Sequence, residues 1–560
     1  MNKQAVYIVL LFLFLGMGAK GQLRIQLEDA DGTSIPMVHV VLPDQSLLLA
    51  DENGLISIDQ RLLPIRIHIS HAGYSSIDTL ITSSDRTLVK LVMQPIMLTS
   101  AVVEADKNSP LGVRDYSILA AKKIDILCPS LIGTNIASAT PRQLFAKVPG
   151  LNIFENGDGG MQLSIGGRGM NPNRSANFNT RQNGYDIAAD PLGYPESYYA
   201  PTINAVAEIR LVRGAGSLQY GPQFGGMLDF KLLQPSNQQT WSIKSVQSLA
   251  SYGTVSSFNA LGYRKKNVHA MAYYQRRQGE GWRQHSAYTS DQFFVSGGWT
   301  SAKHTLGLEF TGHTLLAEQP GGLTDALFVT DPDTTLRYRN YFSVDWKLLA
   351  GFWEWEINSK LKIKTTPFAL MASRSALGVL DKINRSDNRT DRDLIQGTFH
   401  NVGLESKMQW NYDLKGSVNT LIAGVRLFRG NTSAYQGIGK SGSDADFSRD
   451  LDVLGNTSDY QFYNRNAALF VEQVTHLGER WSFIYGGRVE QINTSAAGEY
   501  TRVVTDAAGN ILPTYPRTTA ESSARNRAVF LGAFGVQYRK DMAVAYSSIA
   551  RNYRAINFTD

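Results

Sequence analysis

Residues 203–222 read INAVAEIRLVRGAGSLQYGP, and this stretch decides how the rest of the chain is interpreted. It lies in a region, from Gln94 to about Pro235, that is rich in Gly, Asn, Pro and Arg. The Gly-Ala-Gly step at 214–216 resembles part of a phosphate-binding loop. However, it lacks the Lys-Ser or Lys-Thr of a P-loop and the βαβ setting of a dinucleotide fold, so the sequence argues against nucleotide binding.

Three further blocks accompany this stretch in a fixed order. Residues 141–150 (PRQLFAKVPG) predict a short helix that a Pro-Gly turn closes. Residues 163–175 read LSIGGRGMNPNRS, and residues 225–230 read GGMLDF. Together, the four blocks resemble the plug domain of TonB-dependent outer-membrane receptors over nearly the whole region.

Within that family, the sequences GGRGMNPNRS and DPLGYPESYYAP are most similar to those of the ferric citrate receptor type. One block departs from the family, because Gln182-Asn183-Gly184 replaces its usual acidic-Asp-Gly turn. The resemblance implies a plug inside a 22-stranded barrel. It also implies a transporter that catalyses no covalent chemistry and therefore is not an enzyme.

From Trp241 onward the chain consists of segments in which apolar and polar residues alternate. In residues 305–311, Leu306, Leu308 and Phe310 share one face, and Trp353, Trp355 and Ile357 alternate with polar residues in the same way. Segments of roughly 9 to 15 residues with this alternation suit tilted barrel strands that have lipid on one side and water on the other. A large soluble β-protein is the alternative, and the plug blocks favour the barrel.

The amino terminus predicts export. An apolar stretch at residues 5–17 follows Lys3, and Ala19 and Gly21 are the small residues before a cleavage site at Gln22. This pattern is typical of a secretory signal peptide, and no later apolar run is long enough for a membrane helix. The expected location is the cell outer membrane.

Composition narrows the possible functions further. The 560 residues contain 55 Lys and Arg against 49 Asp and Glu, and this net charge of +6 is spread along the chain. Such a mild excess does not indicate a nucleic-acid partner. Cys128 is the single cysteine, which excludes a disulfide within the chain and a cysteine-based metal site.

Residues 22–96 predict a small antiparallel β-sandwich, because short apolar runs alternate with Asp-Gly and Asn-Gly turns. Their order resembles the carboxypeptidase-regulatory-like sandwich, an accessory fold of exported proteins. His68 and His71 raise the question of a metal pair. On a strand, positions i and i+3 face opposite sides, so we expect a structural role for both.

The resemblance implies a segment that couples the plug to TonB and a set of ion pairs that hold the plug in the barrel. Family members carry a TonB box ahead of the plug, which pairs as a strand with an energy-transducing inner-membrane complex. The candidate box here is Ala101, Val102, Val103, Glu104 and Ala105; the last sandwich strand or a plain linker is the alternative. In the family, two plug arginines also pair with two barrel glutamates, and the matching residues are Arg168, Arg213, Glu472 and Glu490.

The expected ligand contacts lie on the plug apex, in loops near residues 171–181 and 190–199. Arg174, Arg181, Tyr194 and Tyr198 are the candidates, because guanidinium and phenol groups can hold an anionic or oxygen-rich chelate. No cluster of iron ligands is visible in the sequence. We therefore expect no resident cofactor, and iron only as part of a chelated ligand.

The sequence thus predicts a mostly β protein that imports a ferric chelate, such as ferric citrate or another siderophore, across the outer membrane with TonB. A glycan importer with a lipoprotein lid and a non-transporting surface adhesin or structural barrel are the alternatives. The expected divisions are a signal peptide (1–21), the sandwich (22–96), the TonB box and α+β plug (97–238) and a transmembrane antiparallel β-barrel (239–560). About 320 residues accommodate roughly 13 strands, so the barrel is expected to be incomplete at its C-terminal end.

Overall fold

The computed structural model describes residues 22–44, 46–71, 74–82, 87–92, 112–131, 144–145, 148–154, 162–213, 217–221, 224–388, 391–414, 416–508, 510–540 and 543–553. The predicted signal peptide and the candidate TonB box at 101–105 lie outside these residues. The chain divides into two compact units, residues 1–100 and 101–560. Plug and barrel strands thus belong to one unit.

The first unit contains two small sheets that share one apolar core. Strands are ordered β4-β1-β7 in one sheet and β3-β2-β5-β6 in the other. Ile25 of β1 and Ile67 of β5 are fully buried in the same cluster, as expected for facing sheets with alternating residues. The elements are β1 (Gln22–Glu28), β2 (His39–Val41), β3 (Leu47–Leu49), β4 (Leu55–Asp59), η1 (Gln60–Leu62), β5 (Ile65–Ser70), β6 (Ile77–Ile81) and β7 (Thr87–Lys90).

The plug is built on a five-stranded mixed sheet in the order β10-β15-β16-β13-β14. Two short hairpins, β8–β9 and β11–β12, flank it. Of the predicted helix at 141–148, Leu144 and Phe145 are described and helical. The elements are β8 (Val113–Arg114), β9 (Ser117–Ile118), β10 (Lys123–Leu127), η2 (Pro129–Leu131), β11 (Leu151–Phe154), β12 (Ser164–Gly167), η3 (Asn173–Ser175), β13 (Phe178–Gln182), β14 (Tyr185–Asp186), η4 (Ile203–Ala205), β15 (Val206–Arg213), α3 (Ser217–Tyr220) and β16 (Gly226–Leu232).

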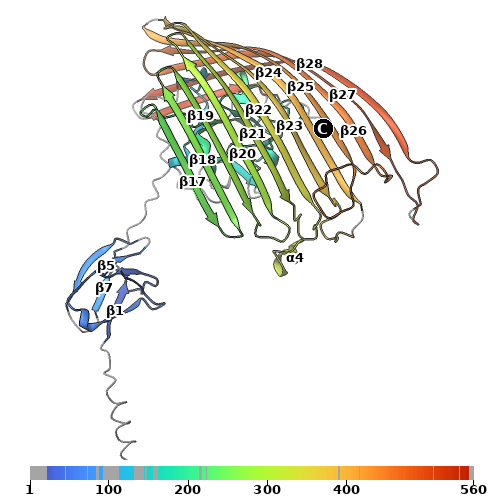
Figure 1. Ribbon diagram of the computed structural model, residues 1–560. Helices are drawn as coiled ribbons and strands as arrows, with labels where there is room; N and C mark the ends of the chain where they lie inside the picture. Colours follow the sequence, from blue (N-terminus) through green and yellow to red (C-terminus); the bar gives the residue numbers. More distant parts are fainter. Residues whose placement is uncertain are drawn as a thin grey trace, which may run out of the picture. The chain divides into compact units, whose positions relative to one another are not determined.

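The remaining strands form one antiparallel sheet of 13 strands in sequence order, which confirms the predicted partial barrel. Figure 1 shows this sheet as a curved, tilted wall with the plug against it. The strands are β17 (Trp241–Ala250), β18 (Thr254–Lys265), β19 (Val268–Gly279), β20 (Tyr288–Thr300), β21 (His304–Glu318), β22 (Tyr341–Asn358), β23 (Leu361–Gly378), β24 (Arg392–Leu414), β25 (Ser417–Gly439), β26 (Thr457–Leu477), β27 (Trp481–Arg502), β28 (Arg517–Lys540) and β29 (Ala543–Ala550), with helix α4 (Asp325–Thr330) in the loop before β22.

The two faces of the wall differ as the alternation predicts. Leu306 and Leu308 of β21 are exposed on the outer face, whereas Glu309 and Thr311 are buried on the inner face. Inner-face aromatic residues such as Trp346 share a core cluster with plug residues such as Tyr198. No helix among the described residues has the length and apolar composition needed to cross a bilayer.

The ends of the wall differ as well. Connections such as 266–267, 301–303 and 359–360 are short, whereas 319–340 and 440–456 are long. Barrels of the outer membrane have short periplasmic turns and longer extracellular loops. By this rule, the long-loop end corresponds to the extracellular end of such barrels.

Gly226 at the start of β16 lets this strand lie directly against β15. Its φ is +116°, and a Cβ atom added there would lie 2.1 Å from the carbonyl oxygen of Val212. We predict that Gly226→Ala destabilises the plug by about 2–6 kcal/mol, from backbone strain and overpacking together. Urea unfolding followed by limited proteolysis of the plug measures this loss.

Gly169 supplies the matched control, because its φ is +77° but a Cβ there meets no described atom within 4 Å. Gly169→Ala should cost only about 1–2 kcal/mol from its left-handed backbone. Equal losses in the two variants would contradict the importance of the β15–β16 approach.

Candidate functional site

A cluster of polar groups on the plug apex surrounds the carboxylate of Glu196. Its Oε2 accepts hydrogen bonds from Arg174 Nη1 at 3.0 Å, Tyr194 OH at 3.2 Å and Tyr198 OH at 2.6 Å. The two tyrosine oxygens lie 2.8 Å apart. Burial raises the pKa of Tyr198 well above its usual value, so its hydroxyl remains a donor. Three of the four predicted ligand residues therefore meet at one point.

The barrel wall adds a second arginine to this cluster. The guanidinium of Arg374, on β23, lies 5.9 Å from the centre of the Tyr198 ring, and that of Arg174 lies 5.0 Å from the same centre. Arg374 Nη2 is 3.4 Å from Tyr194 OH, and its buried Nε has no hydrogen-bond partner among the described atoms. Arg174 and two phenols thus converge on one internal carboxylate, and Arg374 lies beside the phenols.

An open space adjoins this cluster toward the long-loop end. It is a cavity of about 290 Å³. Its lining combines Arg374 with aromatic side chains, namely Tyr194, Phe399, Tyr435, Tyr460 and Phe462. A cavity with apolar walls and a few convergent polar groups is typical of a small-molecule binding site.

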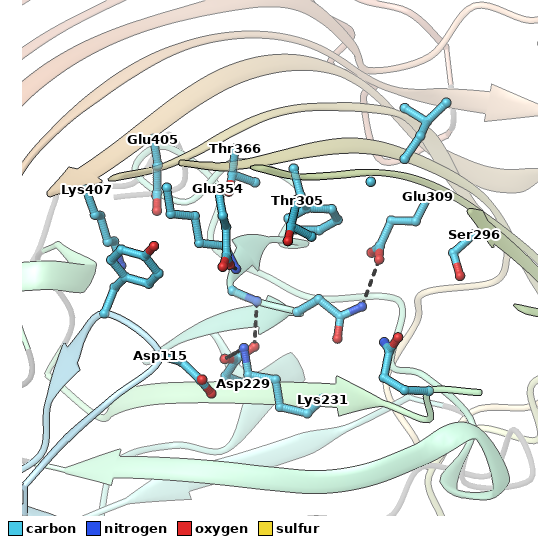
Figure 2. A pocket seen from close by; sticks show the side chains of 18 of the residues that line it. Asp115, Asp229, Lys231, Ser296, Thr305, Glu309, Glu354, Thr366, Glu405 and Lys407 are labelled. Carbon is cyan, nitrogen blue, oxygen red and sulfur yellow. Dashed lines mark hydrogen bonds and ion pairs between the residues drawn. The ribbon is translucent and has the colours of Figure 1, made fainter. Parts of the chain in front are cut away.

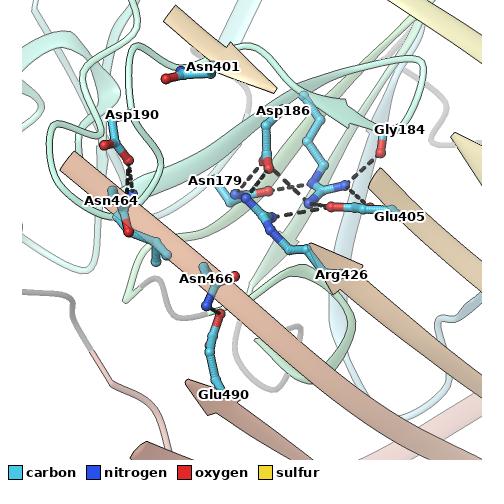
Figure 3. A network of polar contacts seen from close by, with 12 residues as sticks. Asn179, Gly184, Asp186, Asp190, Asn401, Glu405, Arg426, Asn464, Asn466 and Glu490 are labelled. Carbon is cyan, nitrogen blue, oxygen red and sulfur yellow. Dashed lines mark hydrogen bonds and ion pairs between the residues drawn. The ribbon is translucent and has the colours of Figure 1, made fainter. Parts of the chain in front are cut away.

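Arg181, the fourth predicted ligand residue, lies elsewhere and is completely buried. Its Nη1 and Nη2 donate to the two carboxylate oxygens of Glu405 on β24 at 2.9 and 2.8 Å. Asp186 lies 3.3 Å from Arg181 and 2.5 Å from Arg426 on β25, and Arg426 is 3.2 Å from Glu405 (Figure 3). Arg181 therefore joins the plug to the barrel wall, away from the apex cavity.

The four residues expected to lock the plug make other contacts. Arg213 binds Asp125 and the carbonyl of Pro149 within the plug, and Arg168 is exposed in a turn with a φ of +59°. Neither arginine has an ion-pair contact with Glu472 or Glu490 within the described part of the chain. In place of the predicted ion pairs, Glu472 pairs with Lys122 and Glu490 pairs with Arg488.

Glu472 still joins plug and wall through an unpredicted partner. Lys122 Nζ lies 2.5 Å from Glu472 Oε1, and both side chains are buried. Glu490 pairs with Arg488 at 3.1 Å, and Arg488 Nη1 donates to the carbonyl of Leu218 in α3 at 3.2 Å. Both glutamates therefore take part in plug contacts, the second one through its arginine neighbour.

A larger polar cavity, of about 460 Å³, separates the plug from the wall toward the short-turn end. Figure 2 shows acidic and basic side chains around it, including Asp229 and Lys231 from the plug and Glu309 and Lys407 from the wall. At its edge, Asn183 Nδ2 donates to Glu309 Oε2 at 2.8 Å. This asparagine belongs to the Gln-Asn-Gly turn that replaces the family's acidic one, so the amide suits a carboxylate partner.

Several site residues were missed by the sequence analysis. Glu196 lies within the quoted DPLGYPESYYAP block, between two candidate tyrosines, so its position offered a signal. Arg374, Glu405 and Arg426 are separated from their plug partners by about 180 to 240 positions and had none. Over the described ranges, no group of three or more His, Cys, Asp or Glu side chains forms a metal site.

Comparison with known proteins agrees with this geometry. Residues 129–227 match the TonB-dependent Receptor Plug Domain family. The fold is similar to the ferric citrate transporter FecA in its unliganded form, with a TM-score of 0.66 at 20% identity over 82% of this chain and 66% of that one. It is also similar to the ferric-catecholate import receptor Fiu from E. coli K12, with a TM-score of 0.60 at 13% identity over 79% and 72%.

A copper transporter, OprC, has the same fold, with a TM-score of 0.56 at 15% identity over 76% of this chain and 62% of that one. The chain thus spans about two thirds of the length of these structures. Residues 129–227 thus match a TonB-dependent receptor plug domain, and the chain has the fold of these solved receptors over about three quarters or more of its length. Such receptors are non-enzymatic transporters of the outer membrane.

The ion network between plug and wall leads to a stability prediction. Glu405→Gln leaves Arg181 and Arg426 without one of their two carboxylates, and breaking a buried pair typically costs about 3–5 kcal/mol. We expect the plug of this variant to unfold at lower urea concentration than the wild type. Protease sensitivity of the plug across a urea series measures the shift.

Asp413→Asn is the control, since Asp413 and its partner Lys360 are both more than half exposed. It should change stability by less than about 1 kcal/mol. A matching loss in both variants would contradict a special role for the buried network.

Proposed function

We propose that this protein imports a ferric chelate, either ferric citrate or another siderophore, across the outer membrane, driven by a TonB-type inner-membrane complex. The plug domain and the fold similarity to iron-chelate receptors support the class of activity. The choice of an anionic, oxygen-rich cargo rests on the apex cluster, in which Arg174, Arg374 and two tyrosine hydroxyls converge beside a cavity. Iron enters this proposal as cargo.

The chemistry of the cluster favours a carboxylate or catecholate ligand over a neutral one. Guanidinium groups form charge-assisted hydrogen bonds with carboxylates, and these are roughly twice as strong as neutral hydrogen bonds. Glu196 already accepts hydrogen bonds from Arg174 and Tyr198, and this supports the view that these donors suit an acid group. A neutral glycan would leave the Arg374 cation without a counter-charge.

The coupling route in this proposal starts at the TonB box, 101–105, which lies outside the described residues. The next described segment is well placed to transmit a pull. It contains Lys122, paired with Glu472 of the wall, and continues into β10, which is hydrogen-bonded to β15 in the plug sheet. We assign the amino-terminal sandwich, of carboxypeptidase-regulatory-like type, an accessory role.

Ligand binding tests the cargo. We expect the purified full-length protein to bind ferric citrate or another anionic ferric chelate, and Arg374→Gln to weaken that binding about 10- to 100-fold, as for a lost hydrogen bond to a charged group. Fluorescence titration with a panel of ferric chelates, vitamin B12 and oligosaccharides measures this. Arg385→Gln, in an exposed loop, is the control and should bind like the wild type.

Two results would argue against this cargo. Selective binding of oligosaccharides would favour the glycan importer, and binding of none of the ligands would favour a surface adhesin. If Arg374→Gln and Arg385→Gln weakened chelate binding equally, the apex cluster would not be the binding site.

Energy coupling has a separate test. Deleting residues 101–105 should abolish uptake of the labelled chelate by cells while leaving its binding to the cell surface intact, because the box acts only on the periplasmic side. Surface binding and accumulation are measured on the same cells. Undiminished accumulation would contradict the transporter hypothesis.

A further inference from the structure

One row of polar side chains crosses the outer face of four neighbouring strands. Arg429 of β25 lies opposite Arg465 of β26, Arg465 lies opposite Asn493 of β27, and Asn493 lies opposite Asn526 of β28. All four are exposed. Their sequence neighbour Asn464 is fully buried on the inner face, where its amide donates to Asp190 of the plug. The row therefore faces away from the plug, where the membrane lies.

This row marks the upper limit of the apolar outer surface. Toward the short-turn end, Gln491 on β27 is the last polar residue next to the row, and the outward residues Leu427, Leu469, Val489 and Phe530 are apolar and exposed. The aromatic residue Trp481 closes that surface at the short turn. From Trp481 to Asn493 the strand rises about 40 Å along its axis, or about 28 Å along a barrel axis tilted by about 45°.

That height corresponds to the thickness of the apolar belt on such barrels, which is about 25 Å. The row consequently lies where the hydrocarbon of the outer leaflet meets its head groups. Arginine in the middle of the bilayer is costly, by about 2–4 kcal/mol, and this cost falls toward the interface. Arg429 and Arg465 thus stand at the level where lipid phosphates are found.

The two arginines face each other without a compensating acid. Like charges directly opposite on neighbouring strands destabilise a sheet. Within the described part of the chain, neither guanidinium has an ion pair or a side-chain hydrogen bond. Two other outer-face cations are matched by acids, since Arg276 lies 3.3 Å from Asp291 and Lys347 lies 2.7 Å from Asp345.

A hollow of about 530 Å³ surrounds this arginine pair. Strands β25 to β28 supply its whole lining, including Tyr463, Asn493, Ser495 and Asn526, and no plug residue contributes. The hollow is therefore separate from the apex cavity and opens on the outer face. Its outward side chains offer the two guanidinium groups of Arg429 and Arg465, amides and hydroxyl groups, which together are a donor set suited to a phosphate group.

We propose that Arg429 and Arg465 bind the phosphate group of a phosphorylated lipid of the outer leaflet. A phosphate between the two guanidiniums removes their mutual repulsion and accepts hydrogen bonds from both. Its acyl chains extend along the apolar surface formed by Leu427, Leu469, Val489 and Phe530. This inference depends on the outer face lying in a membrane and not on the identity of the imported cargo.

Native mass spectrometry of the full-length protein, released from nanodiscs, tests the proposal. The discs contain phosphatidylcholine with either bisphosphorylated lipid A or the same lipid after enzymatic removal of its phosphates. We expect retention of the phosphorylated lipid, about 10- to 100-fold weaker retention for Arg429→Gln/Arg465→Gln, and weak retention of the dephosphorylated lipid. Arg276→Gln is the control, and it removes one positive charge from the same face next to an acid.

Distinct outcomes would overturn the proposal. The first is that the double variant retains as much phosphorylated lipid as the wild type. The second is that Arg276→Gln loses as much lipid as the double variant, and the third is that the protein retains the dephosphorylated lipid as well as the phosphorylated one. Binding of inorganic phosphate as tight as that of the lipid, measured by calorimetry in detergent, would overturn the assignment to a lipid. Arg429→Lys/Arg465→Lys keeps the charge and should retain part of the binding, which separates recognition from misfolding.

Discussion

The two-residue period of the long strands is the constraint on which the rest of this structure depends. Every strand of the wall presents one side chain toward the plug and the next toward the membrane. On β26, for example, Glu472 is fully buried beside Lys122 of the plug, whereas Val471 is exposed on the outer face. A shift of one residue would exchange these environments, so the register is fixed by both faces at once.

The inner face holds the plug by charges as well as by apolar packing. Buried ion pairs add little net stability, but they penalise strongly the loss of one partner. Arg181, Asp186, Glu405 and Arg426 form such a closed group, in which two cations meet two carboxylates. An interface of this kind is specific in position, and the polar cavity next to it leaves room for rearrangement. These two properties suit a plug that has to remain seated and yet move.

The sequence predicted the fold well and the site in part. The plug blocks, the alternation of apolar and polar residues and the number of strands could be predicted because each depends on local spacing in the sequence. Leu306 and Leu308, for example, alternate with polar residues and are both exposed on the outer face. Arg174, Tyr194 and Tyr198 lie together, as two short loops of one domain allow, and their contact with a ligand stays a prediction. Arg181 was expected at the ligand and lies instead against Glu405, because a contact across 224 positions depends on barrel register, which one sequence does not reveal.

Glu196 gives the apex a property that follows from electrostatics alone. Without a ligand, its carboxylate pairs with Arg174 and accepts both phenol hydrogen bonds, whereas Arg374 has no ion pair with a described residue. Under the proposed function, an acidic chelate has to compete with this internal carboxylate for the same donors. Displaced, Glu196 loses three hydrogen bonds to its Oε2, and its side chain, which is already 16% exposed, has to find other partners. Under the proposed function, anion binding at the apex and displacement of the Glu196 side chain are then one event, because both acids cannot use the same arginine and phenol groups.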